Sequence, residues 1–313
     1  NIGLAVNIRT ETEEQFTGGN LMTAKRMRLL TASLAIIALI AALFVINPGL
    51  GRSASAAWDG TAAAGFESGT GDSSDPYIIK TAEQLAFLAK QVNGGETYQG
   101  KYFQLEADLD LSGSEWTPIG TETVPFSRKF SGNGNVLTNV KISAVGDYIG
   151  LFGYNTGTIT YVGIESGEIS GGNCTGSICG LNAGTITGCY NNAPVTGKES
   201  AGGVCGKNSG TVQMSYNTGA VTGTLKTGGV CGESADRSTL ANCYNTGMLV
   251  GDSVVGGICG SVESSADVSS SFSMAEICGN SEIGGNIGTG PSKNCFYSKD
   301  LFLKEDFGGP VET

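Results

Sequence analysis

The chain has 313 residues, among them 50 glycines, nine cysteines and no histidine, and it carries a net charge of -11 with a sequence pI near 4.5. Without histidine, the Ser-His-Asp and Cys-His mechanisms and the HExxH zinc site are excluded. An acidic chain without clustered Lys and Arg does not suit the phosphate backbone, so we expect no nucleic-acid partner.

Residues 1–56 have the features of an export leader. Lys25, Arg26 and Arg28 precede an apolar run over residues 29–46, and Ala54-Ser55-Ala56 is a small-residue cleavage pattern. Cleavage after Ala56 is therefore predicted. The length of the apolar run also allows an uncleaved membrane anchor, which would be the chain's only contact with a membrane. Both alternatives predict a secreted or cell-surface protein.

Residues 57–145 form a second segment, in which we expect the first turns of a larger fold. A strand is predicted at 75–79, and Thr81 with Gln84 forms a capping box that begins a helix ending at 93–95. Apolar and polar residues then alternate over 103–111, which predicts one strand with a buried and a solvated face. A helix placed across the open end of a stacked sheet would protect it from aggregation.

Three acidic residues lie on the solvated face of that predicted strand: Glu106, Asp108 and Asp110. Such a row could hold Ca²⁺ or supply the carboxylate pair of a glycosidase. It could equally be an ordinary solvated strand face. Nearby, Arg128 and Lys129 could bind a sugar carboxylate or supply a base, or they could be simple loop charges.

Residues 146–298 are a repeat region. One position recurs at Phe152, Cys179, Cys205, Cys231 and Cys259, in steps of 27, 26, 26 and 28 residues. Each repeat also contains a Gly-Thr-Ile-Thr type strand and an aromatic strand that runs into an Asn or Gly turn, as in Tyr-Asn-Thr-Gly, with no room for a crossover helix. This periodicity predicts an all-β fold, a right-handed parallel β-helix with about three strands and three turns per repeat.

Two columns of side chains follow from that stacking. Cys179, Cys205, Cys231 and Cys259 would lie above one another, either as buried free thiols that fill the core or as strained disulfides between turns. Tyr190, Tyr216 and Tyr244 would form a second column, either an exposed surface for ligand stacking or an internal aromatic stack. Because the chain lacks histidine and repeated C-x2-C pairs, we expect no metal and no cofactor.

Several short motifs resemble those of bacterial surface proteins with GLUG-motif repeats. They are Asp75-Pro76-Tyr77, Asp108-Leu109-Asp110-Leu111, Trp116-Thr117-Pro118-Ile119-Gly120 and Phe130-Ser131-Gly132-Asn133-Gly134, followed by the Gly-Ile-Cys-Gly and Gly-Thr-Ile turns. The resemblance covers residues 58–298. It implies an adhesin-like β-helix displayed outside the cell.

These features favour a non-catalytic exported or cell-surface module with a structural, adhesive or interaction role, whose partner would be a surface glycan or protein. One alternative is a carbohydrate-binding or Ca²⁺-binding module without turnover, for which Tyr102 and Trp116 are further candidate stacking residues. The other is a polysaccharide-degrading β-helix enzyme. Residues 281–298 read as a degraded last repeat before an acidic tail over 299–313. We expect the C-terminal end of the solenoid to favour self-association.

Overall fold

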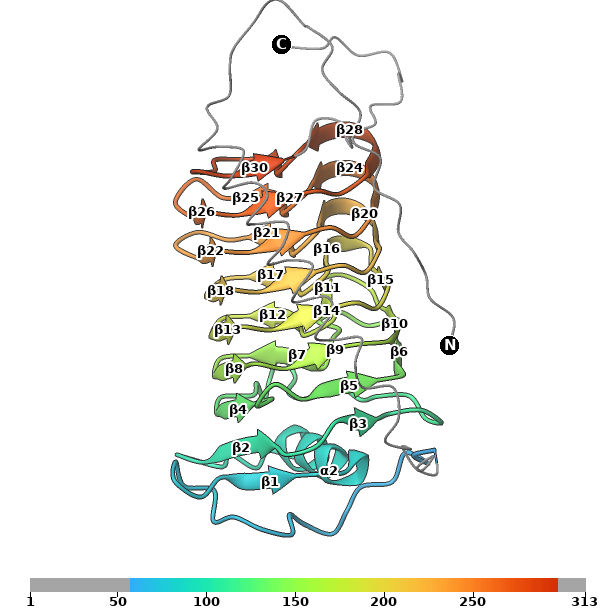
Figure 1. Cartoon of the computed structure of the whole chain (residues 1–313), viewed down its shortest axis with the longest axis vertical. Helices are drawn as coiled ribbons and strands as arrows, with labels where there is room; N and C mark the ends of the chain where they lie inside the picture. Colours follow the sequence, from blue (N-terminus) through green and yellow to red (C-terminus); the bar gives the residue numbers. More distant parts are fainter. Residues whose placement is uncertain (1–56, 298–313) are drawn as a thin grey trace, which may run out of the picture. The chain divides into compact units, whose positions relative to one another are not determined.

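The computed structural model describes residues 57–297, which form a parallel β-solenoid of about eight turns (Figure 1). Each pairing between its named strands is parallel, and each joins residues about one repeat apart. The all-β solenoid predicted from the repeat spacing is confirmed. The leader with its apolar run, the cleavage position Ala56 and the acidic tail lie outside the described residues.

Four parallel sheets run along the solenoid, whereas the sequence predicted about three strands per repeat. The additional strands lie in the segment that follows each Tyr-Asn turn, for example Val195–Thr196 and Glu199–Gly202, which the sequence did not separate into strands. The first sheet, called here the threonine sheet, contains β1 (Tyr77–Ile79), β2 (Tyr102–Leu105), β4 (Lys129–Ser131), β8 (Thr158–Thr160), β13 (Thr185–Thr187), β18 (Thr211–Gln213), β22 (Thr239–Ala241) and β26 (Asp267–Ser269).

The tyrosine sheet consists of short strands: β3 (Leu109–Asp110), β5 (Val136–Thr138), β9 (Gly163–Ile164), β14 (Tyr190–Asn191), β19 (Tyr216–Asn217), β23 (Tyr244–Asn245), β27 (Phe272–Ser273) and β30 (Phe296–Tyr297). The cysteine sheet contains β7 (Phe152–Asn155), β12 (Cys179–Asn182), β17 (Cys205–Asn208), β21 (Cys231–Ser234), β25 (Cys259–Val262) and β29 (Ile287–Thr289).

The fourth sheet, the curved sheet, has its longest strands at the C-terminal end. It contains β6 (Val140–Ser143), β10 (Gly167–Ser170), β11 (Thr175–Gly176), β15 (Val195–Thr196), β16 (Glu199–Gly202), β20 (Val221–Gly228), β24 (Leu249–Gly256) and β28 (Ile277–Gly284). In later turns one continuous strand replaces two short ones, since β15 and β16 both pair with β20.

The register of the cysteine sheet agrees with the sequence period. Phe152 pairs with Cys179, and the column continues through Cys205 and Cys231 to Cys259. Pairing also runs without a break across residue 145, because β6 pairs with β10 and β4 with β8. The proposed division of the chain at that residue stays a prediction.

One helix, α2 (Ala82–Asn93), lies between β1 and β2 in the first turn (Figure 1). The Thr81 side chain accepts a hydrogen bond from the Gln84 backbone N–H, and the Gln84 Oε1 accepts one from the Lys80 N–H at 2.7 Å. This is the predicted capping box, shifted by one residue on its return bond. That the helix serves to cap the solenoid remains a prediction.

The single strand predicted over 103–111 is wrong. β2 ends at Leu105 and β3 begins at Leu109, and the two belong to different sheets. The chain turns a corner of the solenoid between them. Alternation of apolar and polar residues therefore persisted across a bend, because both strands bury alternate side chains in the same core.

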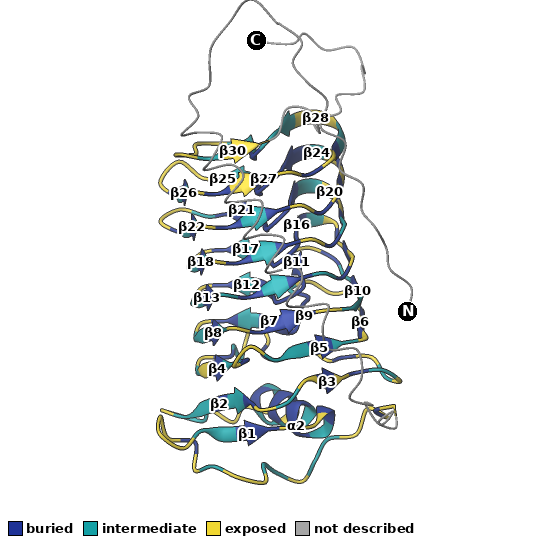
Figure 2. Cartoon of the chain, in the orientation of Figure 1, coloured by how far each residue is buried: buried dark blue, intermediate teal, exposed yellow. Residues whose placement is uncertain are grey.

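The interior is filled by side chains from all four sheets, and buried residues occur in every turn of the solenoid (Figure 2). Two ladders of buried asparagines run through it. Asn155 donates to Asn182 at 2.8 Å and Asn182 to Asn208 at 2.9 Å. The second ladder joins Asn191, Asn217 and Asn245, with both Nδ2···Oδ1 distances at 2.8 Å. Each amide before the end of a ladder thus donates to the next turn, and Asn245, the last of the second ladder, donates to the Gly247 carbonyl of its own turn.

Candidate functional site

The candidate site is a column of aromatic side chains on the tyrosine sheet: Tyr190, Tyr216, Tyr244 and Phe272, called here the aromatic ladder. In each strand the next residue is a buried Asn or Ser. Because neighbouring residues of a strand point to opposite faces, the rings point outward. The tyrosines are half-buried and Phe272 is 41% exposed, so the ladder lies on the outside of the solenoid.

The rings stack face to face. The centroids of Tyr190 and Tyr216 are 4.9 Å apart with ring planes 1° from parallel, and those of Tyr216 and Tyr244 are 4.6 Å apart at 6°. Tyr244 and Phe272 follow at 5.2 Å and 8°. The faces of the inner rings are therefore covered by their neighbours, and a ligand would meet ring edges and hydroxyl groups. Stacking of a ligand on these tyrosines stays a prediction, and the geometry restricts where it could occur.

The ladder begins at Gly163, which pairs with Tyr190. A Cβ added at Gly163 would lie 2.2 Å from Cζ of the Tyr190 ring, so only glycine leaves room for the first ring. The Tyr190 hydroxyl donates to Glu165 Oε2 at 2.9 Å, and the amide of Asn192 donates to the same oxygen at 3.1 Å. Burial, followed by the hydrogen bond to Glu165, raises the pKa of Tyr190.

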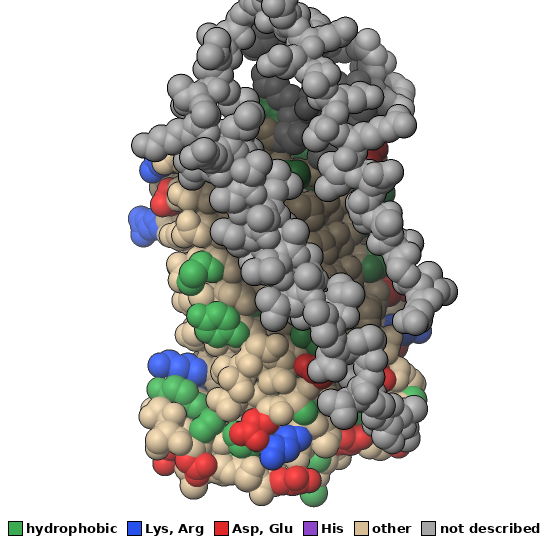
Figure 3. Space-filling view, in the orientation of Figure 1, with side chains coloured by type: hydrophobic (Ala, Val, Ile, Leu, Met, Phe, Trp, Pro, Cys, Tyr) green, Lys and Arg blue, Asp and Glu red, His purple; other side chains and the backbone are tan. Residues whose placement is uncertain are grey.

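Exposed methionines lie close to the ladder in sequence. Met214 precedes Tyr216 by two residues, Met248 follows Tyr244 by four, and Met274 follows Phe272 by two; they are 51%, 44% and 51% exposed. In the view of Figure 3, hydrophobic side chains form separate patches on a surface made mostly of other residue types. Exposed apolar side chains in the same turns as an outward aromatic column are typical of an interaction surface.

Sequence reasoning missed Phe272 and the methionines as part of this surface. The signal for Phe272 was its position 28 residues after Tyr244, the same step that separates Cys231 from Cys259. The methionines carry no periodic signal, since they occupy three different positions of the repeat.

The three acidic residues of the first turns do not converge. Glu106 pairs with Lys80 at 3.2 Å, and Asp108 Oδ1 accepts from the Val136 N–H at 3.0 Å. Asp110 Oδ1 accepts from the Ser112 N–H and from the Asn139 amide, each at 2.9 Å. Each carboxylate stabilises its own corner or loop. Among residues 57–297, no three His, Cys, Asp or Glu side chains form a group that could hold a metal ion.

The cysteine column lies in the core. Cys179, Cys205, Cys231 and Cys259 are fully buried, and all nine cysteines are free thiols. Burial raises the pKa of Cys179, Cys205 and Cys259, which keeps these thiols protonated and unreactive. Cys174 is half-buried, and burial raises its pKa to about 12.

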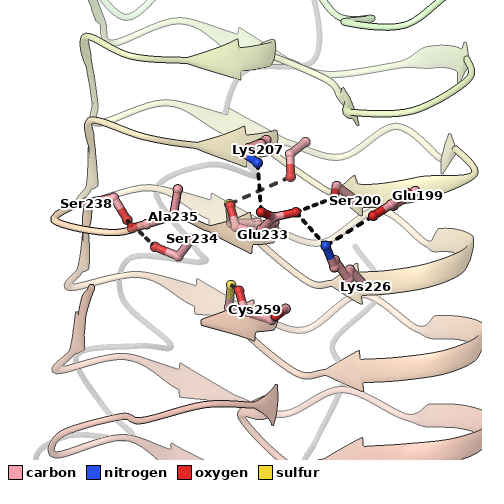
Figure 4. Close-up of polar contacts among 12 residues, drawn as sticks. Glu199, Ser200, Lys207, Lys226, Glu233, Ser234, Ala235, Ser238 and Cys259 are labelled. Atoms are coloured by element: carbon pink, nitrogen blue, oxygen red, sulfur yellow. Dashed lines mark hydrogen bonds and ion pairs between the residues drawn. The ribbon is translucent and has the colours of Figure 1, made fainter. Parts of the chain in front are cut away.

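A charged cluster lies between the cysteine and curved sheets (Figure 4). Glu233 is 6% exposed; its carboxylate accepts from Lys207 at 2.8 Å, Lys226 at 2.9 Å and Ser200 at 3.1 Å. Lys226 also pairs with Glu199 at 3.1 Å. Burial alone would raise the pKa of Glu233, but the hydrogen bonds and charges of the two lysines outweigh it and lower that pKa. The charged groups of the cluster are paired with one another, and these pairs join neighbouring turns of the solenoid.

Comparison with known proteins gives relatives of limited coverage. No family model matches the chain. It is 32% identical over 136 residues to a "Putative Gly-rich membrane protein" of Evansella cellulosilytica, covering 41% of this chain and 14% of that protein. It is 28% identical over 153 residues to "Halomucin" of Haloquadratum walsbyi, covering 44% of this chain and 2% of that protein. The chain thus spans a small part of either relative.

A solved structure shares the fold. The crystal structure of a "putative immunoglobulin A1 protease" from Bacteroides ovatus superposes with a TM-score of 0.62 at 27% identity, over 74% of this chain and 77% of that chain. These similarities are consistent with a β-solenoid module of a membrane or surface protein. Within the part of the chain that the structure describes, no helix is long and apolar enough to cross a membrane.

Proposed function

We propose that this chain is a non-catalytic, exported β-solenoid module that acts at the bacterial surface as an adhesive or interaction element. The observation that carries the proposal is the aromatic ladder, an outward column of four rings, with exposed methionines two to four residues from its rings in sequence. A rigid column of large amphipathic side chains loses little entropy when a partner covers it. The resemblance to GLUG-motif surface proteins supports the same role.

The alternative of a polysaccharide-degrading enzyme requires two carboxylates on either side of one bond, roughly 5 to 9.5 Å apart. Glu106, Asp108 and Asp110 instead bond to separate partners, a lysine and loop amides. Their engagement in local structure favours binding without turnover. A carbohydrate-binding role without catalysis is compatible with the ladder, through ring edges and the tyrosine hydroxyls.

The proposal is tested on protein purified from cells that express the full chain. The protein is applied to glycan and surface-protein arrays with and without Ca²⁺, and bound glycans are analysed for shortened products. We expect selective binding and unchanged glycans. Intact cells probed with an antibody should be labelled, which reports display outside the cell. Release of shortened sugars, or an antibody signal only after lysis, would overturn the proposal.

A matched set of variants locates the binding surface. Replacing Met214, Met248 and Met274 together by Gln removes exposed apolar surface from the turns of the ladder without disturbing the core. Val145, which is 94% exposed and lies outside the ladder, provides the control Val145→Gln. Array binding should fall in the triple variant and persist in the control. Equal binding by both would show that the ladder surface is not the site.

A further inference from the structure

A shallow groove crosses the first turns of the threonine sheet and differs from the rest of this acidic molecule. Its volume is about 370 Å³, and Lys101, Tyr102, Arg128, Lys129 and Thr158 lie along it. Its lining contains three basic residues and no Asp or Glu, in a chain of net charge -11. A local positive site on an acidic protein selects a negatively charged ligand.

The polar groups of the groove form a column along the solenoid. Tyr102 pairs with Lys129, Lys129 with Thr158 and Thr158 with Thr185. The residues that follow them in their strands, such as Phe130 and Ile159, are buried, so this column points outward. At a strand spacing of about 4.8 Å, four successive turns extend over about 14 Å. An extended ligand would fit the groove parallel to the solenoid axis.

Arg128 and Lys129 retain free binding capacity. Arg128 donates through Nε to the Thr97 carbonyl and through Nη1 to the Ser127 carbonyl. Because a guanidinium has five N–H donors, three of them are left for a ligand. Lys129 Nζ donates to the Tyr102 hydroxyl at 3.2 Å and lies 4.9 Å from the Tyr102 ring centroid. Neither residue pairs with a carboxylate among residues 57–297, whereas Lys101 pairs with Asp72.

We infer that this groove binds an acidic oligosaccharide through the carboxylates of its sugar units. The Arg128 guanidinium matches a carboxylate in a fork geometry, Lys129 adds a second positive charge, and Thr158 and Thr185 offer hydroxyls for sugar hydroxyl groups. The half-buried Tyr102 ring provides an apolar surface beside them. This inference rests on the proposed interaction role and adds to the aromatic ladder a second binding surface, on the threonine sheet, with its own ligand class.

The test measures the affinity of the full-chain protein, purified from cells, for a galacturonate tetramer. A neutral tetramer of matched length and a sulfated tetramer without carboxylates are compared with it. We expect the galacturonate tetramer to bind at least tenfold more tightly than the neutral one, since charge-assisted hydrogen bonds are roughly twice as strong as neutral ones. Equal affinity for both would overturn the inference. Binding of the sulfated tetramer alone would overturn the assignment to carboxylates.

Substitutions that remove positive charge in the groove, compared with a control that removes the same charge elsewhere, locate the binding site. Lys129→Gln alone, and Arg128→Gln with Lys129→Gln, should each weaken galacturonate binding, the double variant by roughly a hundredfold or more. Lys198 and Arg237 are exposed and lie outside the groove, so Lys198→Gln with Arg237→Gln is the matched control for the double variant. Thermal melts check that all variants fold. Equal weakening in the control would show a nonspecific charge effect and overturn the site.

The experiments distinguish a failure of the groove assignment from a failure of the proposed function. Turnover of the tetramer with weakening confined to the Arg128 and Lys129 variants would remove the non-catalytic role and keep the groove. Array binding that depends on the methionines but not on Arg128 or Lys129 would remove the groove and keep the module's role.

Discussion

The first turns and the repeats bury their cores in different ways. In residues 57–145, large rings of different types pack at varied angles, for example Phe66 with Tyr77 at 24° and Tyr98 with Phe103 at 86°. In the repeats, small side chains recur in register: Cys179 lies next to Cys205, and Ile186 next to Val212. The core of the first region is irregular and consists of large aromatic side chains. The core of the second region consists of columns, in which equivalent positions of successive turns carry the same or similar side chains. Stability should therefore be concentrated at the N-terminal end.

The largest expected effect is at the junction of the two regions. Phe152 is fully buried, and its ring centroid lies 5.0 Å from that of Phe126 and 5.2 Å from that of Phe130. Phe152→Ala should lower the free energy of unfolding by about 3–5 kcal/mol. Cys205→Ala, in the same column, should lower it by only about 1 kcal/mol because it removes a single sulfur atom. Urea denaturation measures both values, and similar losses would contradict the comparison.

The next effect concerns charge inside the repeats. Glu233→Gln leaves Lys207 and Lys226 without their shared carboxylate, and should cost about 2 kcal/mol, because the lysines are partly exposed. Glu106→Gln breaks an exposed pair in the first turns and should cost less than about 0.5 kcal/mol. Chemical denaturation at neutral pH gives both numbers. A larger loss for Glu106→Gln would reverse the contrast.

Glu233 also predicts a pH dependence. Its pKa is lower in the folded protein than the ordinary carboxyl value of 4.5, so its contribution is present above that value. As the pH falls through the lowered folded pKa, the carboxylate is protonated and the contribution is lost. Denaturation curves from pH 6 downward should therefore show a steeper loss for the natural protein than for Glu233→Gln. Parallel curves would contradict the assignment.

The aromatic ladder should contribute less. Tyr216→Ala interrupts the stack and should cost about 1.5 kcal/mol, whereas Tyr216→Phe should change stability by less than about 0.5 kcal/mol because Phe272 already stacks in the same column. Burial raises the pKa of Tyr216, so its contribution is complete below about pH 10 and is lost as the pH rises through the folded value. Tyr216→Phe should accordingly retain more stability than the natural protein above pH 10 in thermal melts.

The smallest effect is a gain. Met214 has a φ of 50°, a left-handed conformation that costs a side-chain-bearing residue about 1 kcal/mol. Gly188, at the equivalent position one turn below, has a φ of 66°. Met214→Gly should stabilise the protein by about 0.5 kcal/mol, since the glycine's unfolded-state entropy offsets part of the gain. Met248→Gly, at a position of negative φ, should give no gain in the same melting experiment.

The sequence alone predicted the solenoid because stacking of equivalent residues in successive turns sets the repeat length. Equivalent residues such as Cys179 and Cys205 must meet in register, and that requirement leaves the same residue type at intervals of 26 to 28. The helix was predictable from its capping residues, Thr81 and Gln84. The corner between β2 and β3 was not, because Leu105 and Leu109 both point inward on either side of the bend.

The candidate surfaces were predictable only in part. The repeat assigned Tyr190, Tyr216 and Tyr244 to one column, but did not decide between the inside and the outside of the solenoid. The buried Asn191 and Asn217 beside them decide it, and their polar character concealed their burial. Arg128 and Lys129 are adjacent in sequence, whereas the groove also needs Thr185 from two turns further along, which only the register brings near.

The asparagine ladders have a consequence for how such chains change length. Within each ladder an amide nitrogen donates to the asparagine of the following coil, as from Asn155 to Asn182 and from Asn182 to Asn208, until the ladder ends. A duplicated coil inserted in register would accept from its predecessor and donate to its successor, with no orphaned polar group. Unequal recombination that adds or removes whole coils therefore preserves the hydrogen bonds of the asparagine ladders. The number of coils can change during evolution while the structure of each coil is kept.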